Sequence, residues 1–222
     1  LTFVIVGGGA TGVEMAGAIA EVARQTLAAD FRRIDPRNSR IILLEAGPRI
    51  MPTLPEDLSQ YAVRVLNRMG VDVKTFARVT QCDAGGVMLE GLPDLNRIDA
   101  GTVVWAAGVK ASPAARWLSA GHDRAGRVTV EADLSAPGRP SVFVIGDTAH
   151  VLDMDGNLLP GVAPVAKQQG SYVASLIKAR LAGKTTKPFR FKNPGTLATI
   201  GRKAAVVDFG WLRLSGFFAW LL

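Results

Sequence analysis

The stretch FVIVGGGATGVEMAG, residues 3–17, decides the fold class of this chain. The run Thr2–Gly7 is apolar and β-branched, which is typical of a strand buried on both faces of a parallel sheet. Gly7, Gly9 and Gly12 follow it with the spacing G-x-G-x-x-G. The residues after Gly12 have the apolar spacing and alanine content of a helix, which we expect to end near Phe31. A strand, a glycine turn and a helix in this order predict a dinucleotide-binding unit.

Each glycine of this turn has a physical role. The first permits a tight turn, the second lets the backbone approach a pyrophosphate, and the third lets the helix pack closely on the strand. The helix N-terminus then offers unpaired N–H groups and the positive end of its dipole to the phosphates. A glycine-rich turn can also be merely structural, but its position between a strand and a helix favours a nucleotide site.

The second predicted strand, Ile41–Glu45, ends in an acid. An acid at this position accepts hydrogen bonds from the ribose hydroxyls of NADH and repels the 2′-phosphate of NADPH, so NADH is favoured. Arg49 lies close enough in the chain to weaken that preference. Alternatively, Glu45 is a solvated strand end with no ligand.

The remaining segments continue the alternation of strands and helices. A helix after Pro55, a strand after Gly70, a hairpin around residues 83–86 and a strand at Thr102–Gly108 complete the first unit. Two further strands and a helix of about five turns follow. We therefore expect an α/β fold, a parallel sheet with a hairpin. The expected domains span residues 1–112, 113–185 and 186–222.

The predicted strand that ends in VIGD places Gly146 and Asp147 at its carboxyl end. A carboxylate there can accept a hydrogen bond from a sugar or ribityl hydroxyl, and the glycine admits close backbone approach. The same pattern is also a common strand ending, so both interpretations stay open.

The charge of the chain is concentrated near its end. The net charge is +7, and from Lys178 onward nine Lys and Arg residues stand against one acid, Asp208. The aromatic run GWLRLSGFFAWLL, residues 210–222, suits a lipid surface better than nucleic acid, because Trp favours the headgroup boundary and basic residues favour anionic lipid. The alternative is a last helix packed on the protein's own core. No segment is apolar enough to predict a membrane-spanning helix.

The composition argues against disulfide and metal chemistry. A single cysteine, Cys82, excludes an intrachain disulfide and a redox-active cysteine pair. With only His122 and His150 besides, we expect no metal site. The segment DMDGN, residues 153–157, lacks the later acidic ligand of a calcium loop and predicts a hairpin turn.

Six motifs in this order carry a family resemblance. They are FVIVGGGATGVEMAG, IILLEAGPRIMPTLPEDLS, TVVWAAGVKASP, SVFVIGDTA, LPGVAPVAKQQGSYVA and ATIGRKAAVVDFG. Together they closely resemble the type II NADH dehydrogenases, single-chain FAD proteins that pass electrons from NADH to membrane quinone. In that family the NADH domain is inserted into an FAD domain. The resemblance therefore implies a fragment that lacks the N-terminal part of the flavin site and is cut short at its C-terminal end.

The resemblance also implies roles for individual residues. Glu14 resembles the family acid near the nicotinamide and flavin rings, although the helix dipole alone would favour a carboxylate there. Gln168 and Gln169 match a glutamine pair beside the flavin, where quinone docks; without the resemblance, adjacent glutamines on a helix are ordinarily solvated. Pro164 stands where the related pattern often has Gln. The cofactor contacts implied are Gly7, Gly9, Thr11, Gly12, Glu45 and Gly108 for NADH, and Gly146, Asp147, Ala163 and Pro164 for FAD.

The function implied is electron transfer from NADH through FAD to quinone. The same resemblance implies a cytoplasmic protein, peripheral on the inner face of the cell membrane, that contacts the membrane surface through residues 186–222 and binds no nucleic acid; a homodimer is compatible with it. Three alternatives stay open. They are a soluble flavoprotein reductase of the same superfamily, a non-catalytic NADH-binding module, and a membrane-anchoring interaction protein.

Overall fold

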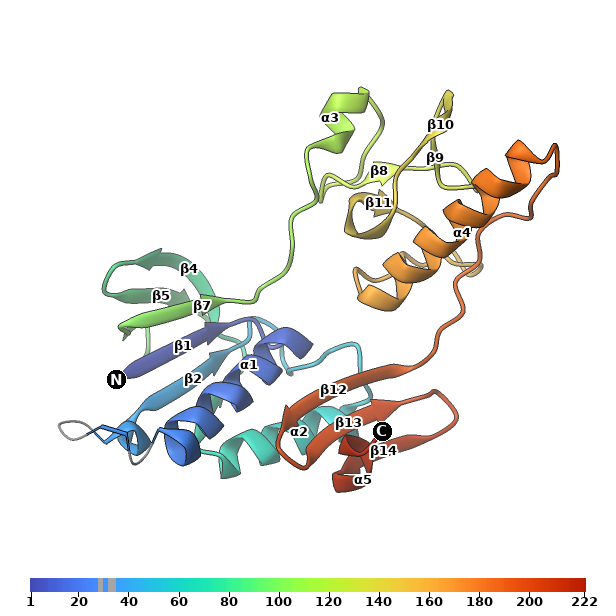
Figure 1. Cartoon of the computed structure of the whole chain (residues 1–222). Helices are drawn as coiled ribbons and strands as arrows, with labels where there is room; N and C mark the ends of the chain where they lie inside the picture. The colour runs from blue at the N-terminus through green and yellow to red at the C-terminus, as the bar shows by residue number, and fades with distance from the viewer. Residues whose placement is uncertain (28–29, 32–34) are drawn as a thin grey trace. The chain divides into compact units, whose positions relative to one another are not determined.

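The computed structural model describes residues 1–27, 30–31 and 35–222. The chain divides into two compact units, and each is described by itself (Figure 1). The first unit joins Leu1–Gly108 with Gly195–Leu222, and the second unit is Val109–Pro194. The last 28 residues therefore group with the first 108 rather than forming a body of their own.

A parallel sheet forms the centre of the first unit, with the strand order β3-β2-β1-β7. Its strands are β1 (Thr2–Val6), β2 (Arg40–Leu44), β3 (Val71–Lys74) and β7 (Thr102–Trp105). Two helices, α1 (Ala10–Glu21) and α2 (Glu56–Arg68), pack on one face of this sheet (Figure 1). The predicted α/β fold with a parallel sheet is confirmed.

Side chains alternate between the two faces of the sheet, as the two-residue repeat of a strand requires. Ile5 and Leu43 pack toward α1 and α2. Val4 and Leu44 pack on the opposite face against an antiparallel sheet. The strands of that second sheet are β4 (Arg78–Asp83), β5 (Gly86–Glu90) and β6 (Arg97–Asp99). The predicted hairpin around residues 83–86 is the β4–β5 turn.

The first helix ends earlier than the sequence predicts. After α1 the chain continues as a short π-helical stretch, η1 (Val22–Thr26), and Leu27 donates its backbone N–H to the carbonyl of Val22. The expected end near Phe31 is therefore wrong, and residues 28–29 of that prediction lie outside the described residues. Before β2 the chain contains a 3-10 turn, η2 (Pro36–Asn38), with Asp35 at its N-terminus.

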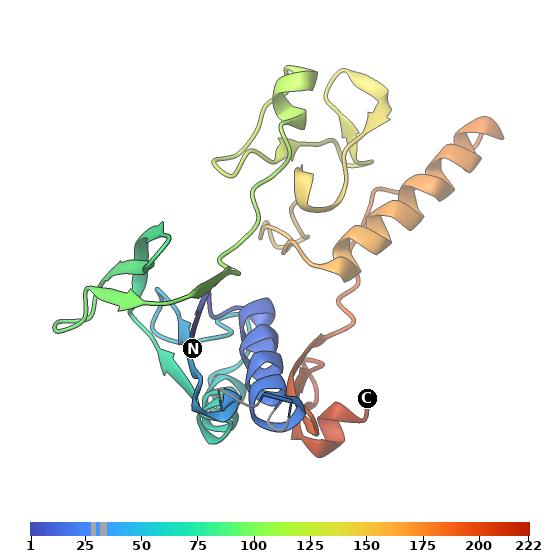
Figure 2. The same ribbon diagram turned by 60° about the vertical axis from the view of Figure 1, so that its left-hand side comes forward.

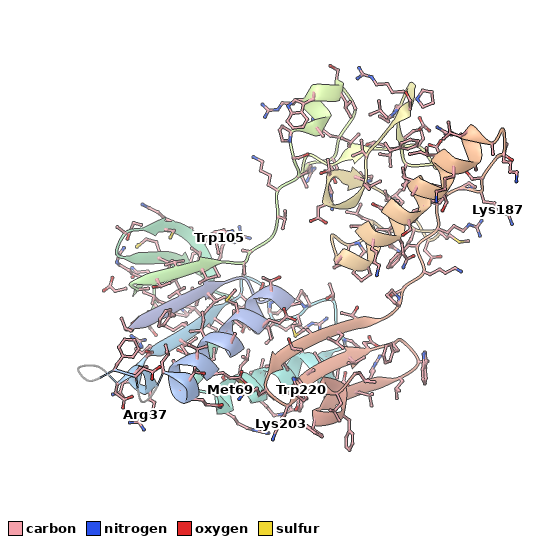
Figure 3. All side chains as sticks on the ribbon, in the orientation of Figure 1. Arg37, Met69, Trp105, Lys187, Lys203 and Trp220 are labelled. Atoms are coloured by element: carbon pink, nitrogen blue, oxygen red, sulfur yellow. The ribbon has the colours of Figure 1, made fainter. Side chains whose placement is uncertain are left out.

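A third, antiparallel sheet covers α1 and α2. It comprises β12 (Thr196–Gly201), β13 (Ala204–Asp208) and β14 (Arg213–Gly216), followed by the short helix α5 (Phe217–Trp220). Figure 2 shows β12 running along α1. Ile200 and Val206 are fully buried in the same core as Ile5, and the Met69 side chain lies against the β12–β13 turn (Figure 3). Part of the basic C-terminal segment is therefore core.

The end of the first unit still exposes large apolar side chains. Trp211 is 84% exposed and Phe218 is 74% exposed, whereas Ala219 of α5 is buried against Ala205 and Val207. The alternative of a last helix packed on the protein's own core is therefore realised only at one face of α5. Among the described residues no helix is long and apolar enough to cross a membrane.

The second unit is built around a small apolar core and one long helix. The core includes Ala115, Val128 and Ala149. Its elements are α3 (Ala114–Leu118), β8 (Val128–Thr129), β9 (Ser135–Ala136), β10 (Arg139–Phe143), η3 (Gly146–Thr148), β11 (Ala149–His150) and α4 (Ala163–Leu181). The last of these is the predicted five-turn helix. The DMDGN segment forms the predicted turn, closed by the bridge between Leu152 and Leu158.

Candidate functional site

The glycine loop between β1 and α1 is held in the geometry that its spacing predicts. Gly7 has a φ of 108°, and a Cβ there would lie 2.8 Å from backbone atoms of Ala106. A Cβ on Gly12 would lie 1.8 Å from the carbonyl oxygen of Gly7. These two positions therefore admit only glycine, because the neighbouring atoms are backbone and cannot move aside cheaply.

Gly9 differs from the other two glycines of the motif. A Cβ on Gly9 would meet no described protein atom within 4 Å, and its φ of −68° suits any residue. Its carbonyl accepts the N–H of Val13 and begins α1. The packing of the described residues thus gives no reason for glycine at this position, and the space beside it is open.

Glu45 clamps the glycine loop from the end of β2. Its Oε2 accepts the backbone N–H of Gly8 at 2.7 Å, and its Oε1 accepts that of Gly47 at 2.6 Å. Hydrogen bonds from neutral donors to a carboxylate are among the stronger ones in proteins. Each oxygen keeps a further lone pair, so the carboxylate can still accept a ribose hydroxyl. Glu45 is therefore not a simple solvated strand end.

Four of the predicted residues line one cavity at the carboxyl ends of the parallel strands. Its volume is about 350 Å³, within the range of small-molecule sites, and the predicted residues in it are Gly7, Gly9, Glu45 and Gly108. In an open parallel sheet, ligands bind at this edge. Thr11 is exposed in the first turn of α1, outside the residues that line the cavity.

Among the other residues that line this cavity, two have side chains that could contact a ligand and were not predicted from the sequence. Trp105, labelled in Figure 3, ends β7 and is 58% exposed, and Arg78 begins β4. An exposed indole in a cavity wall offers a stacking surface for a planar ring. The motif TVVWAAG contains Trp105, so its position at the end of a strand was the available signal. Arg49, by contrast, donates to the carbonyls of Pro52 and Leu54 and does not line the cavity.

Glu14 lies on α1 and does not line this cavity. Its Oε1 accepts hydrogen bonds from the backbone N–H and the Oγ1 hydroxyl of Thr199, each at 3.3 Å. The sequence gives no signal for Thr199, because nothing local predicts a contact between residues 185 positions apart.

Gln169 is the buried residue that organises the second unit's glycine turn. It is 1% exposed, and its Oε1 accepts the backbone N–H of Gly146 at 2.6 Å. The expectation that adjacent glutamines are solvated is wrong at this position, because α4 turns Gln169 inward against η3. Asp147 is exposed and lies close to Gly161. The turn thus presents a free carboxylate beside a glycine with a φ of 66°.

Gln168 has a different environment from its neighbour. Its Nε2 donates to the carbonyl of Lys192 at 2.8 Å, and its Oε1 accepts the N–H of the same residue at 3.0 Å. This pair of bonds ties the segment 186–194 to α4, together with a bond from the Tyr172 hydroxyl to the Lys187 carbonyl. The groove between helix and segment has a volume of about 1290 Å³, and Ala163, Pro164 and Gln168 line it.

Electrostatics stabilises the second unit around Asp123. Burial by itself raises the pKa of this carboxyl, but hydrogen bonds from His150 and Arg127 outweigh burial and hold the pKa well below its usual range. His150 Nδ1 lies 3.0 Å and Arg127 Nε 2.7 Å from Asp123 Oδ2. In the first unit, Arg97 lowers the pKa of the exposed Asp83 to about 2. Neither carboxylate lines the cavity or the groove.

Metal binding has no support in the part of the chain that the structure describes. Within it, no group of three or more His, Cys, Asp or Glu side chains is placed to hold an ion. The DMDGN turn uses Asp153 for internal bonds to the backbone of Asp155 and Asn157.

Comparison with known proteins identifies the family. Residues 1–170 match the family described as pyridine nucleotide-disulphide oxidoreductase. The chain belongs to this family. One curated relative is the type II NADH:quinone oxidoreductase Ndh of Mycobacterium tuberculosis, which is 45% identical to this chain. The match covers 100% of this chain and 49% of the relative. A type II NADH:quinone oxidoreductase of Staphylococcus epidermidis is 32% identical over 93% of the chain and 51% of its own length.

The fold agrees with the family assignment. A structure of NDH2 from Plasmodium falciparum in complex with NADH matches 99% of the chain with a TM-score of 0.86 at 18% identity, and the match covers 60% of that protein. A pyridine nucleotide-disulphide oxidoreductase from Desulfovibrio vulgaris matches 93% of the chain with a TM-score of 0.67. The chain spans about half the length of the curated relatives it matches.

Proposed function

We propose that this chain carries the NADH-binding site, and part of the flavin site, of a type II NADH:quinone oxidoreductase. The observation that carries the proposal is the cavity that brings Gly7, Gly9, Glu45 and Gly108 together at one sheet edge. Two kinds of comparison support it. The curated relatives bear this enzyme name, and a solved structure of similar fold is a complex with NADH.

The residues of the first unit fit the nucleotide without rearrangement. The open space above Gly9 admits a pyrophosphate beside the N-terminus of α1, where the helix dipole favours negative charge. Glu45 is already fixed by two backbone bonds, so little further ordering is required when it accepts the ribose hydroxyls. A 2′-phosphate would face this carboxylate, and the guanidinium of Arg49 is held elsewhere. These features favour NADH over NADPH.

The residues of the second unit fit one part of a flavin cofactor. The exposed Asp147 carboxylate can accept a ribityl hydroxyl, and the Gly146 turn that carries it is fixed by Gln169. Ala163 and Pro164 begin α4, whose N-terminus presents a positive dipole end. When bound, NADH would supply a hydride, that is two electrons and one proton, to FAD, and the reduced FAD together with one further proton from solvent would reduce quinone to quinol. The chain's own residues bind and orient the two cofactors and hold the turns that contact them.

Quinone and membrane contacts complete the proposal. The groove along α4 is lined largely by apolar surface, with Gln168 as a polar group, and would receive the quinone. Because Gln169 is buried and bonded to Gly146, we assign it to positioning that turn rather than to quinone contact. Exposed Trp211 and Phe218 would meet the inner face of the cell membrane. A homodimer stays a prediction.

Substitution of Glu45 tests the NADH site. In the full-length FAD-loaded protein, Glu45→Arg should weaken NADH binding more than about tenfold, because it removes the ribose acceptor and both loop bonds. Asp94→Arg, which changes charge equally at an exposed turn outside the cavity, should leave the affinity unchanged. An unchanged affinity of Glu45→Arg for NADH would contradict the assignment of Glu45 to the NADH site. Absence of NADH:quinone activity in the FAD-loaded wild type would refute the enzyme proposal itself.

Substitution of exposed aromatic residues tests the membrane contact. Deleting residues 186–222 would remove Ile200 and Val206 from the core, so point changes are cleaner. Trp211→Ser with Phe218→Ser should reduce flotation with anionic liposomes several-fold, while Trp117→Ser, an equally exposed tryptophan of the second unit, should not. Equal flotation of the double variant and of Trp117→Ser would contradict the membrane contact of Trp211 and Phe218.

A non-catalytic NADH-binding module is the second candidate. It is favoured by one observation: every residue of the nucleotide cavity lies within the first unit. Equilibrium dialysis of the 222-residue chain against NADH and FAD separates the two. Retention of NADH without FAD favours the module, and retention of both favours a chain that holds the flavin.

A further inference from the structure

Helix α1 and strand β12 meet backbone to backbone. A Cβ on Gly17 would lie 1.7 Å from the carbonyl oxygen of Ile200, so only glycine permits this approach. Glu14 and Glu21 lie three residues before and four residues after Gly17, on the same face of the helix. The contact therefore runs along two turns of the helix that begins at the glycine loop.

Each of these two acids accepts hydrogen bonds from β12 or the turn after it. Glu21 Oε1 accepts the backbone N–H of Arg202. Glu14 Oε1 accepts both the N–H and the hydroxyl of Thr199, at 3.3 Å each. The Glu21 bond holds the strand on the helix without any side chain of β12, whereas the Glu14 contact adds a side-chain donor.

The two donors of Thr199 act on the same oxygen of Glu14. Among the described residues, none donates a hydrogen bond to the other oxygen, Oε2. A carboxylate held by two donors at one oxygen loses rotational freedom about its last torsion, and its second oxygen has a fixed direction. A free side chain at this exposed position would have to be ordered on each encounter with a ligand.

We propose that Thr199 is a positioning residue that fixes the Glu14 carboxylate for the electron transfer between NADH and flavin. The inference rests on the proposed function and on the position beside the nicotinamide and flavin rings that the family resemblance implies for Glu14. Thr199 holds Oε1 and leaves Oε2 for the bound rings. A residue of the C-terminal sheet thereby acts on the reacting rings through the side chain of Glu14, which lies on α1 outside the residues that line the cavity at Glu45.

Kinetics of the full-length FAD-loaded protein test this role. Thr199→Val keeps the shape and the backbone N–H but removes the hydroxyl donor. It should lower kcat about three- to tenfold and change the KM for NADH less than about twofold. Thr199→Ser restores the hydroxyl and should restore kcat. In a Glu14→Gln background, Thr199→Val should have no further effect on kcat, because the two residues act as one unit.

The controls separate positioning from folding. Thr196→Val makes the same change at an exposed position of β12 that does not contact Glu14, and it should leave kcat unchanged. Unfolding temperatures of all variants are measured in parallel. A wild-type kcat in Thr199→Val, a loss that Thr199→Ser does not rescue, or additive effects in the double variant would each overturn the proposal.

The two proposals fail in distinguishable ways. If Glu14→Gln has wild-type kinetics, the role of Glu14 is wrong and that of Thr199 falls with it, while NADH binding at Glu45 is judged separately by Glu45→Arg. If Glu14→Gln lowers kcat but Thr199→Val does not, only the positioning role of Thr199 is overturned.

Discussion

The two units each build a glycine turn whose N–H is held by a distant side chain, but they use different chemistry. In the first unit, Gly8 donates to the Glu45 carboxylate at 2.7 Å. In the second, Gly146 donates to the Gln169 amide at 2.6 Å. Glu45 is only half-buried and ends a strand, whereas Gln169 is completely buried in the middle of a helix. A charged carboxylate therefore accepts the backbone N–H where water and ligand can reach it, and a neutral amide accepts the backbone N–H where they cannot.

This difference predicts different consequences of substitution in the two units. The first turn is shaped by steric contacts between backbone atoms, so its sensitive positions are glycines. The second turn is shaped by one hydrogen bond to a buried side chain, so its sensitive position is the glutamine. The following variants test the comparison, from the largest expected effect to the smallest.

Two glycines of one motif should separate folding from binding. Gly12→Ala places a Cβ 1.8 Å from the Gly7 carbonyl oxygen, and we expect it to lower the free energy of unfolding by about 4 kcal/mol or more. Gly9→Ala meets open space and should change that free energy by less than about 1 kcal/mol. It should nevertheless weaken NADH binding at least about tenfold, because the Cβ stands where the pyrophosphate approaches. Chemical denaturation measures the free energy of unfolding, and NADH titration measures the affinity for NADH.

Loss of the buried amide should destabilise the second unit. Gln169→Leu leaves the part-buried Gly146 N–H without its acceptor and should cost about 1–3 kcal/mol of unfolding free energy. The adjacent change Gln168→Leu removes two exposed hydrogen bonds to the Lys192 backbone and should cost less than about 1 kcal/mol. Urea unfolding of the full-length protein, followed by flavin fluorescence, compares the variants. Equal costs would show that burial of Gln169 is energetically unimportant.

The smallest effect concerns the acid sensitivity of the second unit. The pKa of Asp123 is depressed in the folded state, so its contribution to stability is present above its ordinary pKa and is lost as the pH falls through the lower, folded value. The unfolding temperature should therefore fall between about pH 5 and pH 2, and the fall should be shallower in Asp123→Asn.

The matched comparison is Asp83 in the first unit. Its pKa is also lowered, to about 2, but its ion pair with Arg97 is exposed to solvent. Exposed pairs contribute little to stability, so Asp83→Asn should alter the same pH profile less than Asp123→Asn. The reverse order would indicate that Asp123 is not the acid-sensitive group of the chain.

The same contrast explains what the sequence could predict. The strand, the glycine turn and the start of α1 follow one another in the chain, and Glu45 ends the next strand, so local patterns located this cavity. Gln169 lies 23 residues from Gly146 and Thr199 lies 185 residues from Glu14, with no periodicity that links either pair. The resemblance to a family singled out Gln169, but only its packing shows that it acts on the turn.

The C-terminal segment shows a second limit of sequence patterns. Its charge and aromatic content predict a surface segment, and Trp211 and Phe218 are indeed exposed. Ala198 and Ile200 of β12 alternate with exposed residues and are buried on α1 and α2 instead, together with Val206 of β13. Composition averages over both faces of a strand, so it did not distinguish the face that joins the core from the face that remains free.

A crystal structure of the full-length protein with NADH is the most direct test of the nucleotide site. We expect density for the pyrophosphate over Gly9 at the N-terminus of α1, with a ribose hydroxyl within hydrogen-bond distance of the Glu45 carboxylate. Nucleotide density at another edge of the fold, with no ligand over Gly9 at saturating NADH, would contradict it.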